Sequence, residues 1–142
     1  MGKKINFKAI TTKVKKVKAE TPRLIAGIAV DHFKQSFRDG GFTDDRLNPW
    51  KKRERGNKAD RRTRKSRAIL VDSGDLRRSI KPRRFTFRNI VVGSYGVTYG
   101  KRHNRGLDGM PQRQFMGSSH KMNLQIRLLI RKRIKLAIKN KR

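Results

Sequence analysis

Apolar residues recur at helical spacing near the start of the chain. The first stripe consists of Phe7, Ile10, Val14 and Val17. Steps of three and four residues, with lysines between them, predict a narrow apolar face on a basic helix over residues 1–20. A helix of this kind packs on a core, lies along a neighbouring subunit or binds a membrane surface, and we favour packing over membrane binding.

A wider apolar face follows and predicts a second helix. Thr21 suits the N-cap position and Pro22 suits the first helical turn, while Gly40-Gly41 suits the end of the helix. The face consists of Leu24, Ile25, Ile28, Ala29, Phe33 and Phe37. Its width indicates that this helix lines the core.

Residues 42–67 show no sustained hydrophobic period. Trp50 stands there as an isolated anchor after Asn48-Pro49, and basic residues crowd behind it. These basic residues are Lys51, Lys52, Arg53, Arg55, Lys58, Arg61, Arg62, Arg64, Lys65 and Arg67. Such a segment forms no core of its own. We therefore predict an extended basic arm over residues 43–68, ordered only where something anionic meets it.

The next segment has the pattern of a hairpin. Asp72-Ser73-Gly74-Asp75 breaks the chain and suits the cap of a single turn from Leu76 to Ser79. Ile80 to Phe87 suits a strand, and the β-branched run from Ile90 to Gly93 returns beside it after a turn at Arg88-Asn89. The two strands predict an antiparallel pair.

Glycines and a last apolar face complete the pattern. Tyr95 to Gly109 holds Gly96, Gly100, Gly106 and Gly109, which indicates tight backbone turns. Ser118 or Ser119 suits the cap of a final helix. The apolar face of that helix consists of Met122, Ile126, Leu129, Ile130, Ile134, Ala137 and Ile138.

The order of these elements predicts an α+β fold. It has two N-terminal helices, a small antiparallel β-sheet built on the hairpin, a C-terminal helix and a long basic loop. Residues 1–142 are expected to form a single domain, in which residues 69–142 hold the sheet, the glycine-rich loop and the last helix.

Charge adds the strongest functional signal. Forty Lys and Arg residues against ten Asp and Glu residues give a formal net charge of +30. Self-repulsion on this scale opposes the compact state of an isolated monomer. A polyanion or an acidic neighbouring protein would supply the counter-charge, and nucleic acid is the commonest such partner.

Other residue types exclude several function classes. The chain has no cysteine, which removes thiol catalysis, disulfides and cysteine-ligated zinc. His32, His103 and His120 show no metal-ligand spacing. The start of the chain lacks the apolar run of a signal peptide, and no stretch approaches the roughly 20 apolar residues of a membrane span. We therefore expect no enzyme activity, no cofactor and no membrane partner.

Three clusters of residues carry a resemblance. The first joins Phe33, Phe37 and Gly40-Gly41-Phe42 to Pro49-Trp50. The second is Ile69-Leu70-Val71-Asp72-Ser73-Gly74-Asp75-Leu76-Arg77-Arg78-Ser79-Ile80. The third begins at Val91-Val92-Gly93-Ser94, continues through Tyr99, His103 and Gly106, and closes with Pro111, Arg113, Phe115 and Gly117 in a Pro-x-Arg-x-Phe-x-Gly signature.

In this order and spacing, the clusters resemble the virion morphogenesis family of tailed phages, the Mu-like tail-completion proteins. The resemblance covers the chain from about residue 24 to the C-terminus. Asn104 and Arg105 stand where that family usually has glutamine and an aromatic residue, and Gln114 stands where it often has a second proline.

The resemblance implies a structural subunit of a homo-oligomeric ring in the neck or tail-completion region of a virion. Such a ring joins head and tail and surrounds the DNA channel, and it is assembled in the host bacterial cytoplasm. The expected partners are other neck, portal or tail proteins with acidic surfaces, and genomic DNA through its phosphates. The basic arm would face either the DNA or the acidic protein.

The residues of the motifs are expected to act structurally. Gly74 and Gly106 suit left-handed backbone positions, and Pro111 would hold an extended segment from which Phe115 enters the core. Arg113 would pin that loop by fork-like hydrogen bonds to carboxylate or carbonyl groups. We expect His103 to be buried and hydrogen-bonded to the backbone, with a structural role for Tyr99 beside it. The remaining structural motif residues are Trp50, Leu76, Ser79 and Ile80.

Two other function classes compete with this interpretation. A sequence-independent nucleic-acid-binding protein of ribosomal or nucleoid type fits the charge, with Trp50, Phe85 and Phe87 as stacking residues. A metal-dependent nuclease built on His103 would need further ligands, and the nearby acidic residue is Asp108.

Overall fold

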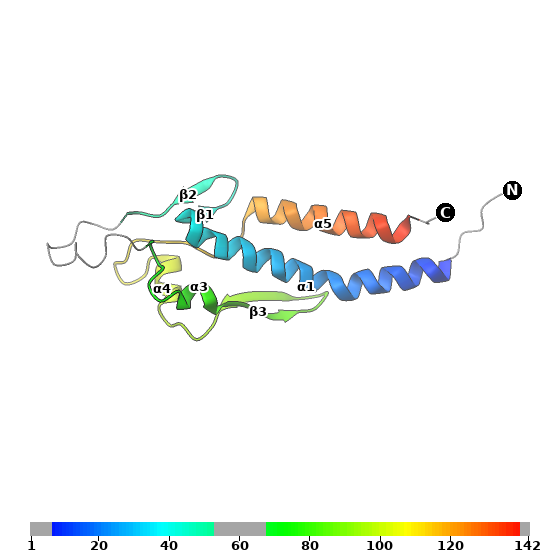
Figure 1. Cartoon of the computed structure of the whole chain (residues 1–142), viewed down its shortest axis with the longest axis horizontal. Coiled ribbons are helices and arrows are strands. Elements are labelled where there is room, and N and C mark those ends of the chain that lie inside the picture. Colours follow the sequence, from blue (N-terminus) through cyan, green and yellow to red (C-terminus); the bar gives the residue numbers. More distant parts are fainter. Residues whose placement is uncertain (1–6, 53–67, 140–142) are drawn as a thin grey trace.

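The computed structural model describes residues 7–52 and 68–139. Its elements, drawn in Figure 1, are α1 Phe7–Asp39, β1 Gly41–Thr43, β2 Leu47–Pro49, α3 Asp75–Ser79, β3 Ile80–Phe85, β4 Ile90–Ser94, α4 Gly100–Arg105 and α5 His120–Ile138. The strands form two antiparallel pairs, β1 with β2 and β3 with β4. The fold is therefore α+β, as the sequence predicted.

The long helix α1 is the spine of the described structure (Figure 1). Its 33 residues give a length of about 50 Å at 1.5 Å per residue. Helix α5 packs along one side of it, and the hairpin of β3 and β4 packs along another. Because these elements cover only part of α1, much of the surface of α1 and α5 remains exposed to solvent.

The prediction of two N-terminal helices was wrong in one respect, because the chain forms a single helix through Thr21 and Pro22. The hydroxyl of Thr21 donates a hydrogen bond to the backbone carbonyl of Val17 at 2.6 Å, as it does inside a helix, and caps no new one. Both residues are buried. Tertiary packing thus offsets the cost of an interior proline, which removes one helical hydrogen bond.

The hydrophobic core lies beside the C-terminal half of α1. Its buried members are Ala29, Phe33, Phe37, Phe42, Trp50, Leu76, Ile80, Phe115 and Met122. They come from both strand pairs, both long helices and the loop before α5. The predicted core face of the second helix is confirmed at Ala29, Phe33 and Phe37, whereas Leu24 is 41% exposed.

Helix α5 begins where the sequence predicted. The side chain of Ser119 accepts a hydrogen bond from the backbone N–H of Met122 at 3.1 Å, as an N-cap does. The carboxylate of Asp44 accepts a second bond, at 2.6 Å, from the N–H of His120. An acidic group at this helix start also matches the helix dipole.

Two small elements were missed by the hydrophobic pattern. The β1–β2 hairpin occupies the start of the predicted arm. It was missed because strands of three residues are too short to show a hydrophobic period. Helix α4 occupies part of the predicted glycine-rich loop, and Gly106 ends it with φ 66°. Residues 53–67, most of the predicted arm, lie outside the described residues.

We expect Pro22→Ala to raise the free energy of unfolding by about 1–2 kcal/mol. An alanine restores one helical hydrogen bond and removes the cost of about 3 kcal/mol that a proline has inside a helix. The loss of the apolar contacts of the proline ring offsets part of this gain. Urea denaturation followed by circular dichroism measures the change. A loss of stability would contradict a continuous α1, because Pro22 would then begin a separate helix.

Candidate functional site

Segments far apart in the chain meet around Phe37. Its ring centroid lies 5.6 Å from that of Trp50, in a T-shaped arrangement, and 5.2 Å from that of Phe115. All three side chains are buried. The indole Nε1 of Trp50 donates a hydrogen bond to the carbonyl of Gln114 at 2.6 Å. Trp50 therefore joins the end of β2 to the loop before α5. Because its side chain is buried, Trp50 is not available to stack on the bases of a nucleic acid.

The second and third motif clusters pack directly on each other. Leu76 and Ile80 are buried within α3 and at the start of β3. The Ser79 hydroxyl donates to the Leu76 carbonyl at 2.7 Å and lies 2.6 Å from the hydroxyl of Ser94. A Cβ added at Gly100 would lie only 3.0 Å from Leu76 Cδ1. The small residue at position 100 thus allows α4 to approach α3.

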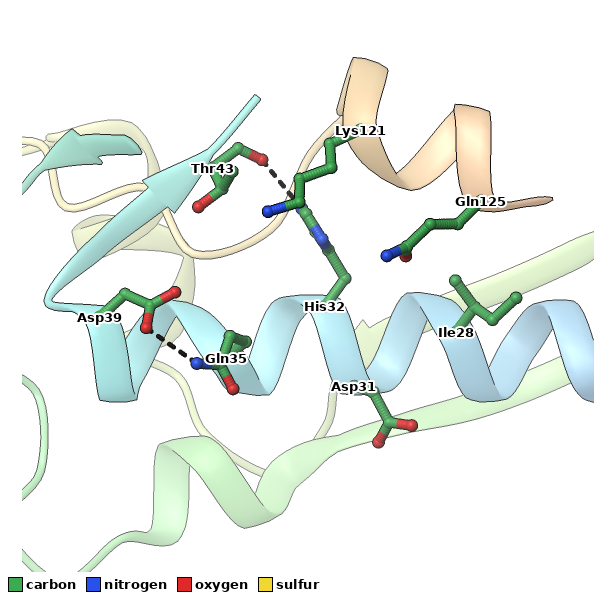
Figure 2. Close-up of a pocket in the computed structure, with 8 residues that line it drawn as sticks. All are labelled: Ile28, Asp31, His32, Gln35, Asp39, Thr43, Lys121 and Gln125. Atoms are coloured by element: carbon green, nitrogen blue, oxygen red, sulfur yellow. Dashed lines mark hydrogen bonds between the residues drawn. The ribbon is translucent and has the colours of Figure 1, made fainter. Parts of the chain in front are cut away.

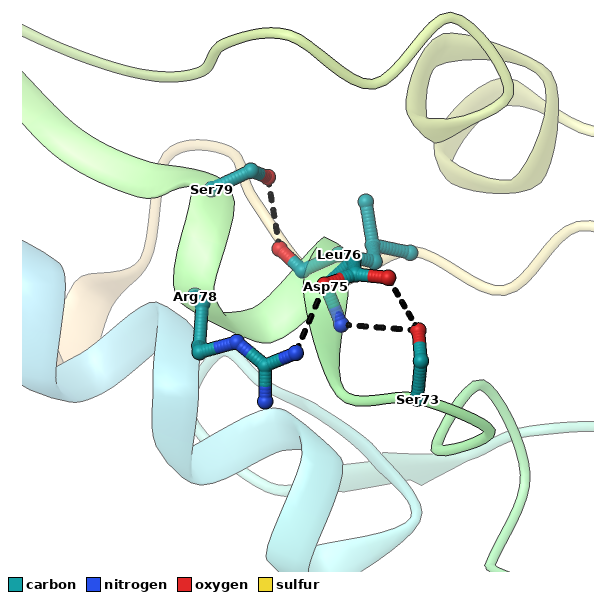
Figure 3. Close-up of polar contacts among 5 residues, drawn as sticks. All are labelled: Ser73, Asp75, Leu76, Arg78 and Ser79. Carbon is teal, nitrogen blue, oxygen red and sulfur yellow. Dashed lines mark hydrogen bonds and ion pairs between the residues drawn. The ribbon is translucent and has the colours of Figure 1, made fainter.

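A polar network fixes the start of α3 (Figure 3). The hydroxyl of Ser73 donates to the carboxylate of Asp75, which also accepts a bond from Arg78 at 2.6 Å. The bonds from Ser73 and Arg78 lower the pKa of Asp75. Gly74 precedes the helix with φ 80°, the left-handed conformation that the sequence predicted. Because the network is exposed, it shapes the turn and adds little to stability.

Asn104 holds the loop that leads into α5. Its Oδ1 accepts hydrogen bonds from the backbone N–H groups of Phe115 at 2.8 Å and Met116 at 2.9 Å. Its Nδ2 donates to the carbonyl of Met116 at 3.2 Å. The sequence pattern did not predict this role, because a side chain that binds backbone groups eleven and twelve residues away leaves no local pattern.

The predicted roles of His103 and Arg113 need correction. Nδ1 of His103 and Nε of Arg113 are buried without a hydrogen-bond partner, so neither the expected bond of the imidazole at that nitrogen nor the fork of Arg113 through Nε is present. Burial, followed by the charge of Arg113, lowers the pKa of His103. The loop is instead joined to α4 through the backbone, where Arg113 N–H donates to the His103 carbonyl at 2.7 Å.

Tyr99 and His103 line one wall of a pocket of about 350 Å³. Their rings meet edge to face, with centroids 6.0 Å apart, and Tyr99 is 42% exposed. Arg113 and residues 69–76 form the remaining walls. Pro111 is half-buried beyond them. Phe115 is fully buried, which confirms its predicted place in the core.

A second pocket, of about 460 Å³, lies between α1, β1 and α5 (Figure 2). His32 enters it, and its Nε2 lies 2.9 Å from the carbonyl oxygen of Thr43. Lys121 and Gln125 reach toward the same space from α5. Burial is the largest cause that lowers the pKa of His32. The imidazole therefore serves as a neutral hydrogen-bonding group that links α1 to β1.

The described residues offer no shared metal site, because no group of three His, Asp, Glu or Cys side chains lies close enough to hold an ion. Within the same ranges, no helix is long and apolar enough to cross a membrane.

Lys51 and Lys52, the first residues of the basic arm, are exposed next to the buried Trp50. The other predicted contact residues of the arm, from Arg53 to Arg67, lie outside the described residues.

The strongest candidate for a functional surface is the distal end, which we define as residues 7–20 of α1 with residues 133–138 of α5. Apolar side chains there have little cover: Phe7 is 72% exposed, Leu136 61% and Ile138 55%. Glu20 bridges the two helices through an ion pair with Arg133.

No protein-family model, no curated protein and no solved structure matches this chain.

We expect Asn104→Ala to lower the free energy of unfolding by about 2–4 kcal/mol. The change leaves the N–H groups of Phe115 and Met116 without their acceptor in a region that is buried or half-buried, at about 1–3 kcal/mol each. Thermal and urea denaturation measure the loss. Gln112→Ala is the matched control, because the Gln112 side chain is exposed and its bond to the carbonyl of Asn104 is long, at 3.3 Å. Equal losses in the two variants would contradict the role of Asn104.

The lowered pKa values of His32 and His103 predict a loss of stability in mild acid. The unfolded chain takes up these protons first, near pH 6.5, so stability is complete above that pH and falls as the pH drops below it. Urea midpoints between about pH 7.5 and about pH 5.5 measure the decline. The double variant His32→Gln, His103→Gln should flatten the decline.

Proposed function

We propose that this protein is a structural subunit of a homo-oligomeric ring in the neck or tail-completion region of a tailed bacteriophage. The ring joins head and tail and surrounds the DNA channel. The ring is assembled in the host bacterial cytoplasm and acts within the virion. No catalytic residue, cofactor or metal is assigned to it.

The observation that carries this proposal is the uncovered distal end. Helices α1 and α5 continue past the hydrophobic core, and the apolar side chains of Phe7, Leu136 and Ile138 project from them with 55–72% of their surface exposed. Exposed apolar patches of this kind on an otherwise charged protein mark association sites. A neighbouring copy would cover these side chains and complete the packing that the isolated subunit lacks.

The motif residues support the same proposal by their position. The clusters that resemble the phage family meet in one core, through Phe37, Trp50, Leu76, Ser79 and Phe115. Their packing builds the scaffold of the subunit. A scaffold with its own small core and two projecting helices suits a subunit whose function is contact with other subunits.

A closed ring needs two different patches on each subunit, because its contact repeats head to tail. The distal end is one such patch. Leu124 and Leu128 form a second, since they lie four residues apart on the same face of α5 and are 49% and 54% exposed. Charge then sets the partners outside the ring. A chain of net charge +30 needs acidic neighbours or DNA to make a dense assembly stable.

A sequence-independent nucleic-acid-binding protein is the second candidate. The observation in its favour is the exposed, basic β3–β4 hairpin with Phe85 and Phe87, which are 46% and 65% exposed. The two candidates differ in assembly. A nucleic-acid-binding protein of this type would bind DNA or RNA as a monomer and form no rings.

We expect the double variant Phe7→Ser, Val14→Ser to abolish ring formation and to leave the fold intact. Both side chains are exposed on α1, at 72% and 38%, so their loss costs the monomer less than about 1 kcal/mol. Negative-stain particle images and light scattering measure the assembly.

The matched control is Leu47→Ser, at an exposed apolar position on β2, which should leave ring formation unchanged. A wild-type protein that stays monomeric at every concentration, with DNA present or absent, would contradict the proposed function.

A further inference from the structure

The tip of the β3–β4 hairpin has an unusual composition. Thr86 and Asn89 close the turn with paired backbone hydrogen bonds, Thr86 N–H to Asn89 carbonyl at 2.8 Å and Asn89 N–H to Thr86 carbonyl at 3.2 Å. The two residues between them, Phe87 and Arg88, therefore form the apex. Figure 1 shows the hairpin running along α1, with the apex well away from the loops around α3 and α4.

The apex presents an aromatic ring and a cation to solvent. Neither Phe87 nor Arg88 has a positive φ, so the turn itself places no demand for glycine at these positions. Phe87 lies outside the core cluster, and 65% of its surface is exposed. A large aromatic ring that is left so exposed at the end of a hairpin is available to contact a partner.

The hairpin is also strongly and uniformly basic. Lys81, Arg83, Arg84 and Arg88 project from it, and no acidic residue occurs anywhere between Asp75 and Asp108. In the described parts of the chain, no carboxylate pairs with any of these four cations.

Two further contacts shape this surface. A register irregularity between Pro82 and Arg84 leaves Arg83 as an extra residue, and a bulge of this kind redirects a side chain. Arg83 lies 5.8 Å from the ring of Tyr95, and Lys18 of α1 lies 4.7 Å from the ring of Phe87. A cation therefore lies beside an aromatic ring at two places on this surface, at Tyr95 after β4 and at the apex.

We propose that the β3–β4 hairpin binds double-stranded DNA without sequence preference. The arginines and Lys81 contact backbone phosphates along the ribbon. Phe87 enters the minor groove at the apex and stacks against a base step, as apolar wedges do in proteins that bend DNA. Lys18, beside Phe87, adds a cation where the phosphates flank the wedge.

DNA fits this surface better than an acidic protein does. Phosphates are spaced regularly along both strands of a duplex, so a row of cations on the hairpin can contact several of them at once. An acidic protein would neutralise the arginines but would give the exposed aromatic apex no stacking partner. The inference rests on the proposed function only for the place of the contact, a hairpin that faces the DNA channel.

The test uses full-length protein and a fluorescent 30-base-pair duplex of arbitrary sequence, with binding measured by anisotropy over a range of salt concentrations. The hairpin variant carries Lys81→Gln, Arg83→Gln, Arg84→Gln and Arg88→Gln. The matched control removes the same charge from α5 through Arg127→Gln, Arg131→Gln, Lys132→Gln and Lys135→Gln. A third variant, Phe87→Ala, keeps every charge.

We expect the hairpin variant to bind at least tenfold more weakly than the control. The slope of the logarithm of the binding constant against the logarithm of the salt concentration should become shallower by roughly 3 to 4, since each phosphate contact contributes about 0.9 to that slope. Phe87→Ala should bind about tenfold more weakly with an unchanged salt slope, and it should abolish the DNA bend that energy transfer between end-labelled dyes reports.

Equal binding by the hairpin variant and the α5 control would overturn the inference, because only net charge would then matter. Polyglutamate that competes with DNA at equal charge concentration, and whose own binding needs the hairpin, would overturn the choice of DNA. Particle images separate this inference from the proposed function. If the DNA-binding test fails but the protein still forms rings, the inference is wrong and the proposed function stands. If DNA binding depends on the hairpin but the wild-type protein forms no rings, the inference stands and the proposed function is wrong.

Discussion

The position of Phe37 governs the rest of the molecule. Its ring packs on Trp50 from the β1–β2 hairpin and on Phe115 from the loop before α5, so one residue of α1 sets where two distant segments lie. The indole bond to the Gln114 carbonyl fixes the register between them. Once these segments are placed, α5 can begin only beside α1, and α3 and α4 close the remaining side. The core is small, and all of it lies at one end of a long spine.

The sequence predicted the elements best where a pattern is long or carries a specific cap. The core face of α1, a serine cap for α5 at position 118 or 119 and the pairing of β3 with β4 were foreseen. The turn of the hairpin lies at Phe87-Arg88, one residue before the predicted position. The prediction failed where local and tertiary preferences conflict. Thr21 and Pro22 have the chemistry of a helix start, yet burial of both residues keeps one helix continuous. Asn104 was overlooked, because a side chain that binds backbone groups eleven and twelve residues away leaves no periodic trace.

Charge and packing divide the molecule into two parts with different physical demands. Around Phe37 the chain satisfies its own apolar and polar groups, with exceptions at His103 and Arg113. Away from that core, the helices and the hairpin present cations together with exposed apolar side chains. Exposed apolar side chains beside many like charges are unfavourable for an isolated monomer. The proposed contacts therefore use the projecting elements, and the core holds those elements in place.

The proline inside α1 has a mechanical consequence. A missing helical hydrogen bond makes a helix easiest to bend at that point, and Figure 1 shows that the axis of α1 changes direction along its length. Pro22 separates the residues that pack in the core from those that reach outward. It therefore marks the point at which α1 bends most easily. The outer part of the helix can change its angle to the core there with the least disturbance of the packing around Phe37.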